Sequence, residues 1–77
     1  SRDRPMITLT RLDHTRFAVN PDLIERVHES PDTTLHMVDG RVYNVEESLD
    51  ELIARIVAYR ARVLAAASAL TAASAQD

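Results

Sequence analysis

The feature that most constrains this chain is a β-hairpin pattern that occurs twice. Residues Thr34 to Val45 form two runs with alternating apolar side chains around Asp39-Gly40, a pair that suits the positive φ angles of a tight turn. The same pattern occurs earlier, at Thr8 to Val19. The corresponding residues are Thr8 and Thr34, Leu9 and Leu35, Leu12 and Val38, Asp13 and Asp39, Phe17 and Tyr43, and Val19 and Val45. The chain is therefore expected to contain two hairpins built on one plan.

The apolar pattern also predicts the register of each hairpin. A two-residue loop would place the apolar residues of the two strands on opposite faces, whereas a three-residue loop places them on one face. The three-residue loop predicts the pairs Leu35 with Tyr43, Thr33 with Val45, Leu9 with Phe17, and Ile7 with Val19. It also puts Gly40, and His14 at the corresponding position, in the left-handed region, which His tolerates better than most residues.

The order of the remaining signals predicts an α+β fold. We expect a small antiparallel sheet of two repeated β-hairpins plus a linking strand, followed by one long C-terminal amphipathic helix. Strands are expected at Met6–Leu12, Arg16–Val19, Ile24–Glu29, Thr33–Met37 and Arg41–Val45, and the third of them should contain a bulge. A helical turn is expected at Asn20–Leu23. The helix should begin at a capping box formed by Ser48 and Glu51 and end at about Ala73. We interpret residues 1–5 as a disordered leader or vector remnant, 6–64 as a single domain, and 65–77 as an alanine-rich helical extension and tail.

The predicted helix is longer than the sheet that it would cover. Its apolar stripe follows alternating steps of three and four residues: Leu49, Leu52, Ile56, Tyr59, Val63, Ala66 and Leu70. Short strands of ~17–20 Å cannot cover a helix of ~37 Å. We therefore predict a homo-oligomer, with self-association through the surface Leu52, Ile56, Tyr59, Val63, Ala66 and Leu70. The alternative is that the residues after Leu64 fray as a chain end.

Composition limits the possible functions. The chain has 77 residues, no cysteine, and a net charge of −3, so neither a disulfide nor a thiolate metal site can supplement a small core. The acidic balance makes nucleic-acid binding an unfavourable hypothesis, because such binding requires excess positive charge. No apolar run has the ~20 residues that span a bilayer. We expect a cytoplasmic protein.

The sequence shows no catalytic constellation, so we expect a non-enzymatic protein with no cofactor, metal or small-molecule substrate. His28 and His36 would face each other across adjacent strands for some loops at Pro31, but two imidazoles alone make a poor metal site. The carboxylates Glu46, Glu47, Asp50 and Glu51 cluster at the predicted helix start, and we interpret all four as helix-capping residues.

Two helical arginines form a candidate partner surface. Arg55 and Arg62 are seven residues apart and therefore share a helix face, which would suit an acidic partner. The alternative is an ordinary solvated face, with Arg55 paired to Glu51 one turn earlier.

Several segments together resemble one protein family. They are Met6-Ile-Thr-Leu-Thr-Arg-Leu, Phe17, Asn20-Pro-Asp-Leu-Ile-Glu25, Pro31-Asp-Thr-Thr, Asp39-Gly-Arg-Val-Tyr43-Asn-Val-Glu-Glu-Ser48, Ile56 and Tyr59-Arg60. In order and spacing the chain resembles the small flagellar FlbD proteins, also called the swarming-motility SwrD family, from Met6 to about Val63. It departs from the family at Asp13-His14, where Asn-Gly is usual, and in the alanine-rich extension.

The resemblance implies a bacterial motility accessory protein that supports flagellar motor power through protein contacts. The expected partner is a flagellar motor or stator-related protein, and the expected location is the cytoplasm, peripheral to the flagellar base. An alternative comes from Leu9-Thr10-Arg11, which is similar to the start of the CsrA family of RNA-binding regulators. That match ends after a few residues, and the glycine-containing motif that follows in CsrA proteins is absent.

Overall fold

The computed structural model describes residues 6–75, which form five strands and two helices in the expected order. The elements are β1 (Ile7–Thr10), β2 (Arg16–Val19), the 3-10 helix η1 (Pro21–Leu23), β3 (Ile24–Glu29), β4 (Thr33–Met37), β5 (Val42–Val45) and α1 (Leu49–Ala75). The α+β class is confirmed, although β1 and β5 are shorter than predicted. The expected leader, residues 1–5, and the last two residues of the expected tail lie outside the described residues.

Both hairpins have the predicted antiparallel register. In the first, Leu9 pairs with Phe17, and in the second, Leu35 pairs with Tyr43. The outer pairs are Ile7 with Val19 and Thr33 with Val45. The expected bulge in β3 is also present, as a register shift between Ile24 and Arg26. The requirement that apolar residues share a face was therefore sufficient to determine the strand pairing.

The two turns are closed in the same way. Gly40 has a φ of 93° and His14 a φ of 73°, so both residues occupy the left-handed region. In the first turn the Asp13 carboxylate accepts a hydrogen bond from the Thr15 backbone N–H at 3.0 Å. In the second turn the Asp39 carboxylate accepts a hydrogen bond from the Arg41 backbone N–H at 2.9 Å. The repeated aspartate thus stabilises each turn through an Asx-type hydrogen bond.

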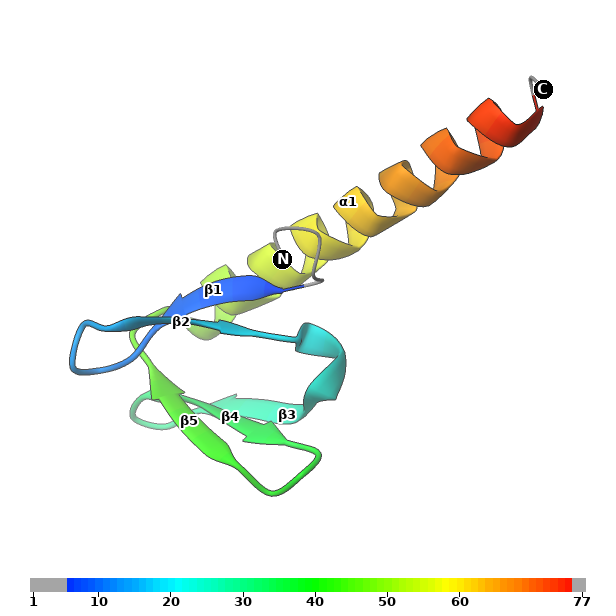
Figure 1. Ribbon diagram of the computed structural model, residues 1–77. Coiled ribbons are helices and arrows are strands. Elements are labelled where there is room, and N and C mark those ends of the chain that lie inside the picture. Colours follow the sequence, from blue (N-terminus) through cyan, green and yellow to red (C-terminus); the bar gives the residue numbers. More distant parts are fainter. Residues whose placement is uncertain (1–5, 76–77) are drawn as a thin grey trace.

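The strands form two small sheets, and the prediction of a single sheet was wrong in this respect. One sheet contains β1 and β2, and the other has the order β3-β4-β5. A single antiparallel bridge between Arg11 and Val45 joins them, supported by a 2.8 Å hydrogen bond from the Glu46 N–H to the Thr10 carbonyl. The chain bends at this corner, so the β1–β2 hairpin lies across the three-stranded sheet (Figure 1).

The core lies between the two sheets and the first turns of α1. The buried apolar residues are Ile7, Leu9, Val19, Leu35, Met37, Val45, Leu52 and Tyr59. The helix begins with the predicted capping box, in which Ser48 Oγ accepts from the Glu51 N–H at 3.1 Å and Glu51 Oε1 accepts from the Ser48 N–H at 3.2 Å. Glu29 of β3 also accepts from the Leu49 N–H at 3.2 Å, which ties the helix start to the larger sheet.

The molecule is elongated because α1 extends beyond both sheets. Its principal extents are 52 × 22 × 22 Å and its radius of gyration is 15.0 Å, whereas a compact domain of this length would have a radius of about 11–12 Å. Figure 1 shows the C-terminal turns of α1 projecting away from all five strands.

Candidate functional site

We call residues 49–60 of α1 its inner half and the helical residues after them its outer half. The outer half presents apolar side chains to solvent. Every described residue from Ala61 to Leu70 is exposed, including Val63 at 47% and Leu70 at 71%. A second set, Ile53, Val57 and Leu64, is also exposed along an adjacent face of the helix. Contiguous exposed apolar surface of this kind is typical of an interaction site.

The six residues predicted for self-association divide into two groups. Leu52 and Tyr59 are buried in the core of their own chain, with 0% and 6% exposure, and Ile56 is half-buried against that core. Val63, Ala66 and Leu70 are exposed. The second group is therefore accessible to another protein without rearrangement of the fold.

A shallow hollow continues this surface toward the sheets. It has a volume of about 310 Å³ and is lined by Asp22, Tyr59, Arg60, Val63 and Leu64. Two of these residues form an ion pair, in which Nη2 of Arg60 on α1 lies 3.7 Å from Oδ1 of Asp22 on η1. The hollow therefore joins the exposed Val63 and Leu64 side chains to Asp22 of η1.

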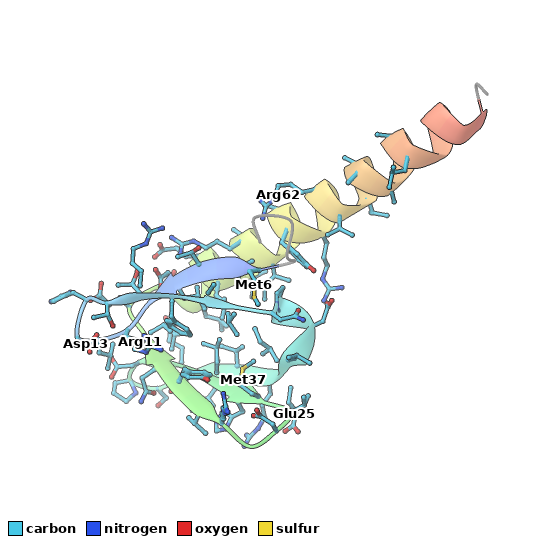
Figure 2. All side chains as sticks on the ribbon, viewed as in Figure 1. Met6, Arg11, Asp13, Glu25, Met37 and Arg62 are labelled. Atoms are coloured by element: carbon cyan, nitrogen blue, oxygen red, sulfur yellow. The ribbon has the colours of Figure 1, made fainter. Side chains whose placement is uncertain are left out.

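A second, larger hollow lies between α1 and the β1–β2 hairpin. It has a volume of about 510 Å³ and is lined by Met6, Ile7, Thr8, Thr10, Arg16, Glu47, Arg55, Ala58 and Arg62. We call it the arginine groove. It contains both predicted arginines, Arg55 and Arg62, and adds Arg16 from β2; Figure 2 labels Met6 and Arg62 on its walls. Three guanidinium groups against one carboxylate make this groove electropositive.

Arg55 is already engaged within the chain. Its Nη1 donates to the Thr8 carbonyl at 2.8 Å and to Glu47 Oε2 at 3.0 Å, and 43% of its side chain remains exposed. Its ion pair is therefore with Glu47 rather than with Glu51, which forms the capping box instead. Within residues 6–75, neither Arg16 nor Arg62 forms an ion pair, so these two guanidinium groups carry the available positive charge of the groove.

Glu47 has a different role from the one predicted. Its side chain is only 7% exposed, and it accepts hydrogen bonds from the Thr10 N–H at 2.9 Å and the Thr10 hydroxyl at 2.8 Å. Burial raises the pKa of Glu47, but the Thr10 hydrogen bonds and the Arg55 charge outweigh it, so the pKa is lowered from its ordinary value. The interpretation of Glu47 as a capping residue was wrong, because its carboxylate links β1 to α1.

The segment that forms both hairpins and the inner half of the helix matches a known family model. The match covers residues 6–64 and is to FlbD, described as flagellar and swarming motility proteins. The chain belongs to the FlbD family. Comparisons with curated proteins and with solved structures give no significant match.

The FlbD match includes the arginine groove and ends within the exposed part of α1. Arg16, Arg55 and Arg62 lie inside the matched segment, whereas Ala66 and Leu70 lie beyond it. Neither helix of this FlbD-family chain, within the residues that the structure describes, has the length and hydropathy of a membrane-spanning segment.

Sequence reasoning missed Arg16 and the structural role of Glu47. Thr10 and Glu47 are 37 residues apart, so no local spacing connects them. The register of the first hairpin, however, places Arg16 opposite Thr10 at the end of β1, next to the helix start. That pairing was the one available signal that Arg16 and the helical arginines lie in the same groove.

Proposed function

We propose that this FlbD-family chain is a non-enzymatic accessory protein that supports flagellar motor power through protein contacts. It would act in the cytoplasm at the base of the flagellum, on a motor or stator-related protein. The observation that carries the proposal is the outer half of α1, which extends beyond the domain with Val63 and Leu70 exposed. A domain with this shape is suited to joining proteins rather than to enclosing a substrate.

The outer half of α1 is proposed to pair with a second copy of the chain. Val63 and Leu70 are seven residues apart, the spacing of a coiled-coil seam, and Ala66 between them permits close approach of helices. The segment from Val63 to Leu70 contains no charged residue, so two copies would not repel each other there. Self-association of a small domain without disulfides also removes apolar surface that its own core cannot cover.

The arginine groove is proposed to receive an acidic segment of the flagellar partner. Among the described residues, no carboxylate forms an ion pair with Arg16 or Arg62, and Thr8 of β1 also lines the groove. Carboxylate side chains or a chain terminus would match these guanidinium groups. Rim charges of this type mainly set specificity and the association rate.

The test is complementation of a deletion strain, with separate counts of flagella and measurements of swimming force. We expect the deletion to leave filament number normal and to weaken swimming. Val63→Glu with Leu70→Glu, and separately Arg16→Ser with Arg62→Ser, should fail to restore force. Ala61→Glu with Ser68→Glu adds the same charges at the same spacing on the opposite helix face and should restore it. Missing filaments in the deletion strain would instead indicate a role in flagellar assembly or gene regulation.

The alternative function is that of a small CsrA-like RNA-binding regulator. Retention on RNA or heparin resin distinguishes it from the motility function. The net charge of −3 predicts weak retention on RNA or heparin resin at low salt. Strong retention that Arg16→Ser with Arg62→Ser abolishes would favour RNA as the ligand of the groove.

A further inference from the structure

Two histidines meet on the face of β3 and β4 that points away from the core. On β4, His36 lies between the buried residues Leu35 and Met37, so its side chain points to the opposite face of the sheet. There its Nε2 lies 3.0 Å from Nε2 of His28, which extends from β3. The ring centroids are 5.0 Å apart, farther than the two Nε2 atoms.

At least one imidazole of the pair must be neutral, because two protonated rings would have no acceptor for a hydrogen bond between the Nε2 atoms. A neutral imidazole has one ring nitrogen with a free lone pair, which is the form that binds transition metals. Without a metal, one Nε2–H can donate to the other Nε2, and this hydrogen bond holds the two nitrogens close together.

The distance between the nitrogens fits a shared metal ion. Imidazole nitrogens bind at about 2.0–2.1 Å, so two ligand atoms separated by 3.0 Å subtend an angle of about 94° at the metal. That angle is near the 90° of tetragonal sites and well below the roughly 109° of tetrahedral ones, and tetragonal N,O coordination is typical of Cu²⁺ and Ni²⁺.

We infer that His28 and His36 form a two-imidazole binding site for Cu²⁺ or Ni²⁺ on the outer face of the three-stranded sheet. Among the described residues, no group of three or more His, Cys, Asp or Glu side chains is placed to hold a metal, so water would complete the coordination. The site therefore binds reversibly, with Cu²⁺ stronger than Ni²⁺ or Zn²⁺ according to the general order of divalent metal affinities.

The test uses the full chain without an affinity tag, in calorimetry and in electron paramagnetic resonance with Cu²⁺. We expect one copper per chain and nitrogen splitting from two imidazoles. His28→Ala and His36→Ala should each weaken binding by roughly tenfold or more, because loss of even an outer-sphere partner costs about that much, and the remaining spectrum should show one imidazole.

The matched control is His14→Ala, which removes the third histidine. His14 is exposed and contacts the Glu46 carboxylate, so it offers a competing nitrogen and oxygen pair for the metal. His14→Ala should leave the copper affinity and the two-nitrogen signal unchanged. Copper binding that is equal in His28→Ala, His36→Ala and the parent chain, or that is lost in His14→Ala, would overturn the assignment.

Discussion

The two halves of α1 carry the same apolar stripe but have opposite environments. In the inner half, Leu52 is fully buried and Tyr59 is nearly so, whereas in the outer half Val63 and Leu70 are largely exposed. The inner half is also anchored by the Ser48 capping box and by the ion pair between Arg55 and Glu47. The comparison shows that helical periodicity identifies the apolar face of a helix but not what that face contacts.

The two halves of α1 should differ most in the unfolding free energy that is lost when a leucine is replaced by alanine. Leu52→Ala should cost about 2–5 kcal/mol of unfolding free energy, because it leaves a cavity in the core. Leu9→Ala and Leu35→Ala, which remove fully buried leucines from the two hairpins, should cost the same. The matched control Leu70→Ala should change stability by less than about 0.5 kcal/mol at dilute protein. Urea melts measure all four, and a loss below about 0.5 kcal/mol for any of the three core leucines would contradict the packing described.

A smaller effect is expected at the carboxylate that holds the inner half against β1. Glu47→Gln removes the charge that faces Arg55 and one acceptor for Thr10, and it should cost about 1–3 kcal/mol. The control is Asp50→Asn, an exposed residue in the first helical turn, which should cost a few tenths of a kcal/mol. Equal losses for the two variants would mean that Glu47 acts only through the helix dipole.

The same carboxylate should make stability depend on pH in the acid range. The pKa of Glu47 is lowered in the folded chain, so the unfolded chain takes up its proton at a higher pH. Its contribution is therefore complete above its ordinary pKa of 4.5 and is lost as the pH falls through the lower folded value. Urea melts between pH 7 and 3 should show a steeper acid loss in the parent chain than in Glu47→Gln. Identical slopes would contradict the network.

The smallest change in unfolding free energy is expected for substitutions in the outer half of α1. Val63→Glu with Leu70→Glu should leave the unfolding free energy of dilute protein within about 0.5 kcal/mol of the parent, because both side chains are exposed. Circular dichroism should retain the strand signal. A loss of several kcal/mol would show that the outer half contributes to the fold and would remove its contrast with the inner half.

Much of the fold could be predicted from the sequence because it depends on local patterns. Alternating apolar residues gave the hairpin register, and Ser48 with Glu51 gave the helix start. The division into two sheets was not predictable in this way, because it depends on the bridge from Arg11 to Val45 between distant segments. The assignment of Glu47 failed for the same reason, since its partner Thr10 lies in another strand.

The candidate site was only partly predictable. Arg55 and Arg62 share a helix face, so their spacing identified them, but Arg16 joins them only through the packing of β2 near the helix. Of the six residues predicted for self-association, the stripe alone could not separate Leu52, which the strands cover, from Leu70, which they do not reach.

The most direct test of the account is light scattering coupled to gel filtration of the full chain across the micromolar range. We predict a homo-oligomer for the parent chain, a dissociated monomer for Val63→Glu with Leu70→Glu, and an unchanged oligomer for the control Ala61→Glu with Ser68→Glu. A monomer at every concentration of the parent chain would contradict it. An oligomer that persists with glutamates at both Val63 and Leu70 would also contradict it and would indicate association through a sheet edge instead.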